Sequence, residues 1–273
     1  MKSVILIVLY KETILSSRTV SSLINNCRTE IKDAILFLWD NSPVIMEQRY
    51  FEILDENKIK YEYSHTPENL PLSEIYNKVV NIYRIQNYDL LFLFDQDSDI
   101  TPLYFESIKN AYTQNPDINL FVPYIVVENK IVSPGDIGLY TGRYWSKKRT
   151  GRIEAKNRIA IASGMLIRFD CFVAQNLEFD ENLLFYGIDT KFCIDYSRKN
   201  KWIYVIDYQL THSLSIFENE SNKLKINRLR SHGSSLRYIF RKNLLGYLLA
   251  SISYSFKLIR LKVLIFRDER HNK

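Results

Sequence analysis

Three aspartates that follow a short apolar segment are the residues of this chain best suited to chemistry. The segment LLFLFDQDSD, residues 90–99, carries Asp95, Asp97 and Asp99 at alternate positions after five apolar residues. Such a run predicts a buried strand that delivers the carboxylates at its carboxyl end. Hard cations such as Mg²⁺ and Mn²⁺ take oxygen ligands, usually one or two carboxylates together with substrate phosphates. The segment therefore predicts a metal-diphosphate site around Asp95 and Asp97.

The acidic segment has two other interpretations. It could be a solvated turn in which Asp99 caps a helix that begins near Pro102. An EF-hand calcium loop is disfavoured, because the required glycine and the distal glutamate spacing are absent.

The elements around the acidic segment predict where it lies. Apolar runs (VILIVLY, AILFLW, KYEYS, LLFLF) alternate with amphipathic segments at 19–29, 44–57 and 72–86. This βαβα order predicts an α/β fold with a mainly parallel sheet covered by helices. Ligands of such sheets bind at the carboxyl ends of the strands. The polar residues after the first two strands, Tyr10–Glu12 and Asp40–Ser42, should therefore share a crevice with Asp95 and Asp97.

The middle of the chain gives a weaker signal. Residues 130–156 are rich in Gly, Ser, Arg and Tyr and show little periodicity. This composition is typical of a mobile surface loop.

Composition and charge bound the class of protein. The 273 residues are 46% hydrophobic, which suits one large domain with an appendage. The three cysteines form no disulfide framework or CxxC knuckle, which favours a reducing cytoplasm. The VILIVLY run is too short for a leader or anchor, and no uncharged apolar stretch reaches the roughly 18 residues of a membrane span.

The net charge of +6 is unevenly distributed. Residues 223–273 carry thirteen Lys or Arg against two acids, and residues 1–222 carry 24 against 29. No zinc finger or RNP-like stretch accompanies the basic tail, so nucleic acid is not an expected partner. An anionic membrane surface is the better candidate.

Helical spacing supports that expectation for the tail. Leu236, Phe240, Leu244 and Leu248 recur every four residues, and farther along Lys257, Arg260, Lys262 and Arg267 interleave with apolar residues. Basic amphipathic helices of this type lie in the headgroup region of a bilayer. A helix packed on the main domain or in a dimer interface is the alternative.

Seven segments, in order, resemble glycosyltransferase family 2 and within it the rhamnosyltransferase-like branch of bacterial cell-surface polysaccharide synthesis. The DQDS stretch resembles the acidic site of the family, and RYIFRKN resembles its R-Y-Y-x-x-R-N signature. Pro71 and Ile75 replace the usual Gly and Ala of its N-x-G-x-x-x-A-x-N segment. The resemblance covers roughly residues 4–243, and the remaining similar segments are LWDNSP, ENLPLSEIYN, IASGMLIRFDCF, FDENLLFYGIDTKFCIDYSRKNKW and THSLS.

The resemblance implies roles for individual residues. It makes Asp189 the general base that accepts the proton of the acceptor hydroxyl; from the sequence alone, Asp189 could instead be only the N-cap of a helix. It makes Asp97, with His212, the ligands of Mn²⁺ or Mg²⁺, and Asp40 the contact to a uracil or thymine base. We assign nucleotide and donor binding to Tyr10, Glu12, Asp40, Asn69, Asp95 and Gln96, and the acceptor side to Ser163, Gly164 and Met165.

The sequence thus predicts a GT-A domain over residues 1–222 and a basic helical tail over 223–273. The expected reaction is inverting transfer of a sugar, with rhamnose as first choice, from a dTDP- or UDP-linked donor to a hydroxyl of a growing, lipid-linked surface glycan. Galactose, glucose and galactofuranose are alternative sugars. A nucleotidyltransferase or a non-enzymatic membrane-associated protein are the other classes. The expected location is the inner face of the cell membrane, as a peripheral cytoplasmic protein.

Overall fold

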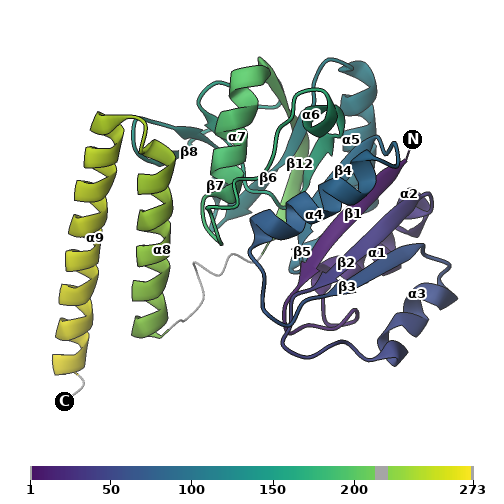
Figure 1. Cartoon of the computed structure of the whole chain (residues 1–273), viewed down its shortest axis with the longest axis horizontal. Coiled ribbons are helices and arrows are strands. Elements are labelled where there is room, and N and C mark those ends of the chain that lie inside the picture. The colour runs from purple at the N-terminus through teal and green to yellow at the C-terminus, as the bar shows by residue number, and fades with distance from the viewer. Residues whose placement is uncertain (1, 213–220, 272–273) are drawn as a thin grey trace.

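The computed structural model describes the backbone of residues 2–212 and 221–271, while the side chains of His212, Lys223 and 266–271 lie outside the description. Within these residues, twelve strands form one connected, curled sheet with helices on both faces (Figure 1). The main path of the sheet has the order β10-β7-β6-β11-β4-β1-β2-β3. The α/β fold with a mostly parallel sheet is therefore confirmed.

The N-terminal half of the sheet is parallel. It comprises β1 (Ser3–Leu9), β2 (Ala34–Asp40), β3 (Tyr61–His65) and β4 (Leu90–Asp95). The two neighbours of β1 are β2 and β4, and β3 pairs with β2 on the outer side. The connecting helical elements are α1 (Arg18–Asn26), α2 (Arg28–Ile31), η1 (Gln48–Phe51), α3 (Glu52–Glu56) and α4 (Leu72–Arg84).

The continuous apolar strands are explained by burial on both faces of the sheet. Successive side chains of a strand point to opposite faces. Accordingly, Val4 and Leu6 of β1 join the core beneath α4, α6 (Asp170–Val173) and α7 (Ile188–Lys199), while Ile5 and Ile7 join the core beneath α1, α3 and α5 (Pro102–Gln114). Helices on both faces thus fix the parallel strands in register, and with them the residues at their ends.

The second half of the sheet departs from the expected loop. Residues 130–156 contain the strands β7 (Lys130–Ile137), β8 (Gly142–Trp145) and β9 (Gly151–Glu154), so the prediction of a mobile loop is wrong. The strands β7 and β8 pair with the strands that directly precede them, β6 and β7, while β9 pairs with the distant β12. Gly and Arg within these strands interrupt the apolar alternation by which a strand is recognised in the sequence. A Cβ on Gly135 would lie 2.7 Å from the Arg143 carbonyl oxygen, so this glycine permits the close approach of β7 and β8.

The remaining strands surround the acidic segment. They are β5 (Ser98–Asp99), β6 (Leu120–Val127), β10 (Arg158–Ile159), β11 (Met165–Arg168) and β12 (Trp202–His212). The strand β11 runs antiparallel between β4 and β6, and β12 pairs with β5, β6 and β9. The helix near Pro102 is capped by Thr101, not by Asp99, which belongs to β5.

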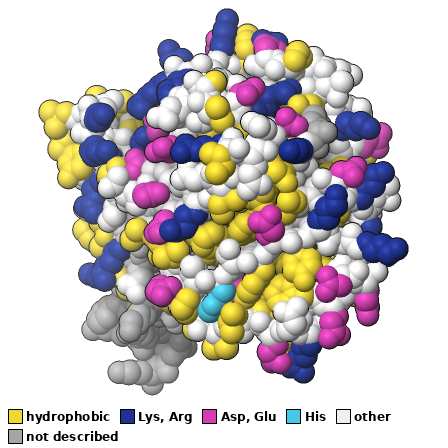
Figure 2. Space-filling model, turned by 45° about the vertical axis from the view of Figure 1, so that its right-hand side comes forward, with side chains coloured by type: hydrophobic (Ala, Val, Ile, Leu, Met, Phe, Trp, Pro, Cys, Tyr) yellow, Lys and Arg dark blue, Asp and Glu magenta, His cyan; other side chains and the backbone are white. Residues whose placement is uncertain are grey.

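The chain ends in a helical hairpin of α8 (Asn222–Phe240) and α9 (Leu244–His271), which lies beside the sheet domain (Figure 1). Residues 241–243 separate the two helices, so the four-residue apolar repeat from Leu236 to Leu248 does not run along a single helix. Hydrophobic and basic side chains alternate along the edge formed by the hairpin, at the left of Figure 2. No helix among the described residues is long and apolar enough to cross a membrane.

Candidate active site

The predicted site residues of the first half meet at one edge of the sheet. In the parallel register, Asp40 of β2 lies opposite Leu9 of β1, and Asp95 of β4 lies opposite Val8. Because β1 separates β2 from β4, Asp40 and Asp95 are two strand spacings apart, about 10 Å. The crevice predicted at the strand ends is therefore where the sequence placed it.

Hydroxyl groups hold the acidic turn from beneath. The Ser98 amide donates to Thr19 Oγ1 (2.8 Å), the amide of Asp95 donates to Ser163 Oγ (3.1 Å), and the Ser98 and Ser163 hydroxyls are 2.8 Å apart. Ser98 and Ser163 are buried, whereas Asp95, Gln96 and Asp97 are partly exposed. Because buried polar groups fix the backbone, the carboxylates of the turn are presented to the crevice in a defined arrangement.

Gln96 joins this turn to the end of β1. Its Oε1 accepts a hydrogen bond from the Tyr10 amide (2.7 Å), and the Thr19 amide donates to the Gln96 carbonyl (3.1 Å). The side chain of Gln96 therefore binds protein backbone. Its predicted donor contact, like that of the half-exposed Tyr10, stays a prediction.

A cavity of about 320 Å³ opens over Asp40, within the roughly 300–1,000 Å³ usual for small-molecule sites. The Asp40 carboxylate is buried and accepts hydrogen bonds from Tyr63 Oη (2.7 Å) and the Ser42 amide (3.0 Å). Two fixed donors leave lone pairs for a ligand N–H. Val44 and Ile45 give the opening an apolar rim, and the other lining residues are Lys11, Glu12, Thr13, Ser42, Pro43, Met46, Glu47 and Tyr50.

Asn69 lies beside this cavity on the loop after β3. Its Oδ1 accepts from Asn41 Nδ2 (2.8 Å), and Asn41 also bonds the Leu70 backbone. The positive φ of Asn69, 52°, is a conformation that asparagine tolerates better than most residues. The structure thus gives Asn69 a role in shaping the loop, and its contact to a nucleotide stays a prediction.

Carboxylates also cluster beside the acidic turn. Burial and the negative charge of Asp97 raise the pKa of Glu12, and Glu12 Oε2 is buried with no hydrogen-bond partner among the described residues. A cation would relieve both effects, and an all-oxygen set suits Mg²⁺ or Mn²⁺. The residues therefore fit a divalent ion whose shell is completed by diphosphate oxygens.

The described residues alone do not supply a complete metal shell. The described residues contain no group of three or more metal-ligating side chains in suitable geometry. The backbone of His212 pairs with Ser98 beside the acidic turn, but its side chain and the rest of THSLS, 213–215, lie outside the described residues. The predicted ligand role of His212 therefore stays a prediction.

Asp189 enters the site from the other half of the chain. It is the second residue of α7, whose N-cap is Gly187 with φ 79°, so Asp189 is not the cap of this helix. Burial, followed by the negative charge of Asp95, raises the pKa of Asp189 to about 6, although the Thr190 amide donates to its Oδ1 (2.6 Å). Burial, and then the charges of Asp95 and Asp189, raise the pKa of Tyr76, so the three side chains share one environment.

Ser163, Gly164 and Met165 form a buried wall beneath the site. The Gly164 amide donates to the Leu93 carbonyl (2.7 Å), and a Cβ at Gly164 would lie 2.6 Å from the Pro123 ring. Together with the hydrogen bonds of Ser163, these contacts support the acidic turn. The predicted acceptor contact of the tripeptide stays a prediction.

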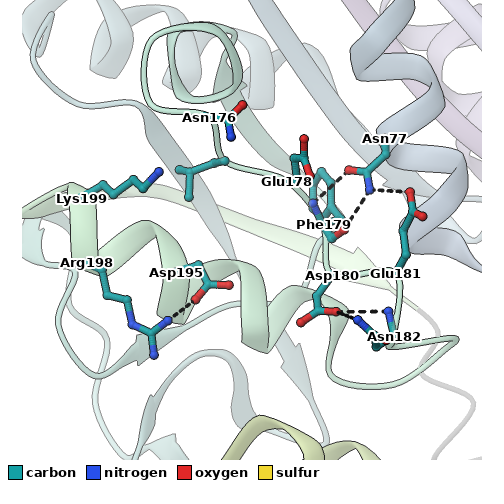
Figure 3. A pocket seen from close by; sticks show the side chains of 11 residues that line it. Asn77, Asn176, Glu178, Phe179, Asp180, Glu181, Asn182, Asp195, Arg198 and Lys199 are labelled. Carbon is teal, nitrogen blue, oxygen red and sulfur yellow. Dashed lines mark hydrogen bonds and ion pairs between the residues drawn. The ribbon is translucent and has the colours of Figure 1, made fainter. Parts of the chain in front are cut away.

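A second hollow, of about 490 Å³, lies between α4, the 176–182 segment and α7 (Figure 3). Its polar groups are mostly engaged with one another. Asn77 Nδ2 donates to the Phe179 carbonyl (2.8 Å) and to Glu181 Oε1 (2.9 Å), and Arg198 Nη1 donates to Asp195 Oδ1 (2.6 Å). Because these side chains satisfy one another, the hollow is lined by a structural hydrogen-bond network beside α7.

Two contributors to the site were not found from the sequence. Tyr63 orients Asp40, and its position on an alternating strand was the only available signal. Tyr238 of α8 donates to Asp180, nine residues before Asp189. The RYIFRKN resemblance marked Tyr238 without giving it a task.

Comparison with known proteins shows similarity of structure. No family model matches the sequence, and no curated protein matches it. A crystal structure of S. aureus TarS residues 1–349 is similar at a TM-score of 0.58 and 13% identity, over 95% of this chain and 73% of that one. The same segment with UDP gives 0.58 and 13%, over 92% and 68%.

A second protein, GalNAc-T7 with UDP, GalNAc and Mn²⁺, gives a TM-score of 0.58 at 12% identity, over 88% of this chain and 47% of that one. Both neighbours are GT-A-type glycosyltransferases. The chain therefore has the GT-A glycosyltransferase fold.

Proposed function

We propose that this protein transfers a sugar from a nucleotide-diphosphate donor to a hydroxyl of a glycan acceptor. The observation that carries the proposal is the order of groups along one sheet edge. The cavity over Asp40 lies about 10 Å from Asp95, two strand spacings away, which suits a base at one end and a diphosphate at the other. Asp189 is close enough to Asp95 for the charge of Asp95 to add to the effect of burial on its pKa, which suits a base beside the diphosphate.

Each residue has a defined task in the proposed reaction. Asp40 accepts the ring N–H of a uracil or thymine base, and the apolar rim at Val44 and Ile45 covers the base. Asp189 takes the proton of the attacking hydroxyl. A pKa of about 6 leaves it ionised at neutral pH yet basic enough to accept a proton. Attack opposite the departing nucleotide inverts the anomeric centre.

A divalent ion, Mn²⁺ or Mg²⁺, would be held by Asp97, with Glu12 nearby and His212 as a further proposed ligand. When bound, such an ion neutralises charge on the departing diphosphate. Asp95 helps to hold the nucleotide, and Ser98, Thr19 and Ser163 keep the acidic turn in place. The ion found with GalNAc-T7 supports a metal in this fold.

Rhamnose from a dTDP donor is our first choice, and UDP-linked galactose, glucose or galactofuranose are alternatives. Sugars that differ by one hydroxyl require pocket contacts that strand-end motifs do not specify. UDP in the complexes of TarS and GalNAc-T7 supports a pyrimidine nucleotide. A nucleotidyltransferase would usually carry a glycine-rich phosphate loop near the N-terminus, and the first glycine of this chain is Gly135.

Calorimetric titration of UDP, dTDP and GDP, each with and without Mn²⁺, tests the proposal. We expect Mn²⁺-dependent binding of a pyrimidine nucleotide, which Asp97→Asn abolishes because an amide is a weak ligand for a hard cation. Asp99→Asn, on the exposed end of the turn, is the matched control and should bind normally. Equal binding by Asp97→Asn and the parent would refute the proposed metal site. A screen of donor hydrolysis over UDP-, GDP- and dTDP-sugars identifies the sugar once nucleotide binding is established.

We also propose that α9 attaches the enzyme to an anionic membrane surface, where a lipid-linked acceptor would lie. Six large apolar residues between Leu245 and Val263 are each 45–67% exposed. At about 100° per residue they fall within about 80° of one helix face, over roughly 27 Å. The opposite face is covered, since Ala250 is buried and Tyr254 packs on Gly233 of α8. The stripe consists of Leu245, Leu248, Ile252, Phe256, Ile259 and Val263.

Charge favours lipid over a second copy of the chain as the occupant of this stripe. Residues 224–265 contain nine Lys or Arg and no acid. Two copies would bring like charges together, whereas anionic headgroups compensate them. Arg260 and Lys262 lie on either side of the stripe, where their apolar stems allow the charged ends to reach headgroups.

Vesicle co-sedimentation of the full chain tests attachment. Binding should require anionic phosphatidylglycerol, weaken as salt rises and fall at least tenfold in Ile252→Ser/Phe256→Ser/Ile259→Ser. A control that removes equally exposed apolar side chains from the sheet domain should bind as the parent does: Ile85→Ser/Leu103→Ser/Val173→Ser. Unchanged vesicle binding by the stripe variant would refute the proposal. The proposal would also be refuted if the parent did not bind vesicles but formed a dimer that the stripe variant lost. Peripheral location at the inner membrane face follows from this attachment.

A further inference from the structure

The Asp180 carboxylate lies where α8, the segment after Asp180 and α7 meet. Tyr238 Oη of α8 donates to it at 2.9 and 3.0 Å, and Asn182 donates through its amide (3.1 Å) and side chain (2.8 Å). Lys191 Nζ of α7 lies 3.8 Å away. Burial alone raises the pKa of Asp180, but these hydrogen bonds and the Lys191 charge outweigh it and lower the pKa below its usual value. The ionised carboxylate therefore links α8 to α7.

A second contact joins α8 to the beginning of α7. Gly187 is the N-cap of α7, and a Cβ there would lie 3.0 Å from Ile239 Cδ1 and 3.3 Å from Ser235 Cβ. The rings of Tyr186 and His232 are also neighbours, with centroids 6.3 Å apart. The helix α8 thus packs against the backbone two residues before Asp189.

We propose that α8 positions Asp189 and that Tyr238 is the principal positioning residue. Gly187 and Lys191 lie two residues on either side of Asp189. Gly187 packs against α8, and Lys191, whose closer ion pair is with Asp195, lies 3.8 Å from the Asp180 carboxylate that Tyr238 contacts. The proposal rests on the proposed function, because it assigns the task of this anchoring to proton transfer at Asp189. It also makes α8 part of the catalytic unit, although residues 223–273 were expected to form a separate tail.

The proposal accounts for the RYIFRKN segment. The Arg241 guanidinium lies 3.5 Å over the Tyr238 ring, and Arg237 lies 5.0 Å over the Tyr254 ring of α9. Asn243 Oδ1 accepts from the Gly246 amide (3.0 Å) at the beginning of α9. The segment therefore fixes Tyr238 at the junction of α8, α9 and residues 181–188, the strap that leads from Asp180 to Asp189.

Tyr238→Phe tests the proposal, because it removes the hydroxyl and keeps the ring beneath Arg241. A misplacement of about 1 Å can cost up to about a hundredfold in rate, so we expect kcat for transfer to fall about tenfold. The donor KM should stay within twofold, because the proposed donor residues lie at the ends of the parallel strands and not on α8. Tyr254→Phe makes the same chemical change on the same hairpin, away from Asp180, and should leave both constants unchanged.

A double-mutant cycle with Asp180→Asn shows whether the effect passes through this hydrogen bond. If it does, the double variant should be no slower than the slower single variant. Additive losses, an unchanged kcat in Tyr238→Phe, or a parallel loss of kcat, donor affinity and melting temperature each overturn the proposal.

Hydrogen exchange keeps the test independent of the reaction. Amides of residues 183–191 should exchange faster in Tyr238→Phe than in Tyr254→Phe, since the strap loses an anchor. If residues 183–191 exchange faster in Tyr238→Phe but the parent protein transfers no sugar, the proposed function is rejected and the anchoring by Tyr238 stands. Unchanged exchange would reject the anchoring whatever the parent catalyses.

Discussion

The donor half and the acceptor half of the site are built differently. In the donor half, Asp40, Asp95 and Asp97 end parallel strands or directly follow them, and the shared strand register brings them together. In the acceptor half, Asp189 lies on a helix whose start is held by residues about fifty positions away, Ile239 and Tyr238. Parallel strands place a ligand site through local order, whereas the base depends on distant contacts. Substitutions should therefore separate binding from chemistry.

The largest expected separation comes from Asp189→Asn. Asparagine keeps the shape but cannot accept the proton, and loss of general-base catalysis costs about a hundred- to ten-thousand-fold. Transfer should fall by that order while nucleotide affinity changes little. Because Gly187 occupies the N-cap, a silent variant cannot be attributed to retained capping.

Transfer with a defined acceptor and nucleotide titration must be measured on the same preparation of Asp189→Asn. Near-normal turnover would falsify the base assignment. Loss of both properties would move Asp189 to the donor half and break the comparison.

The converse separation comes from Asp40→Asn. A hydrogen bond to a charged acceptor contributes about 1.5–3 kcal/mol, so nucleotide affinity should fall about ten- to a hundredfold. Turnover at saturating donor should remain near the parent value, because Asp40 lies two strands from the chemistry. Tyr63→Phe keeps the Asp40 carboxylate and removes one of its hydrogen-bond donors, so we expect a smaller loss of nucleotide affinity. A loss of turnover without a loss of affinity in Asp40→Asn would contradict the assignment of Asp40 to the base.

The pH dependence of transfer should reflect Asp189. With a pKa of about 6, the side chain becomes the active base as pH rises, so the rate should fall about tenfold for each unit below 6 and level off above it. The charge of Asp95 contributes to this raised value, so Asp95→Asn should shift the midpoint downward. Stopped assays across pH 5–8 with saturating donor measure the profile. A midpoint that Asp95→Asn leaves unchanged would mean that the charge of Asp95 does not influence the titration of Asp189.

The smallest expected effect concerns stability. The folded pKa of Asp189 is raised from 3.8 to about 6, so the folded state binds the proton more tightly and loses stability as pH rises through this interval. The cost above pH 6 is at most about 3 kcal/mol. Asp189→Asn should therefore raise the free energy of unfolding by about 1–3 kcal/mol at pH 7.5.

This gain should disappear near pH 4, where the native side chain is protonated as well. Urea denaturation of parent and variant at the two pH values measures the difference. Equal stability at pH 7.5 would mean that Asp189 is better solvated than its surroundings indicate.

Much of the donor half could be predicted from the sequence. The VILIVLY and LLFLF runs indicated buried strands, and their order indicated neighbouring carboxyl ends, so Asp40, Asp95 and Asp97 were placed at one edge. The strands within 130–156 were missed because their Gly, Ser and Arg residues interrupt the apolar alternation, and because β9 pairs with the distant β12. The break at 241–243 was missed because the apolar repeat continues across it.

The sequence by itself determined the α/β class, the strand-end carboxylates and the basic helical character of the tail, since each follows from local periodicity, residue type or charge. Only the tertiary structure decided that Gly187 is the N-cap of α7, that burial and the charge of Asp95 raise the pKa of Asp189, and that Tyr238 donates a hydrogen bond to Asp180. Local patterns report which face of an element is buried. They do not report which distant element covers it, and in this protein that packing places Asp189, the proposed base.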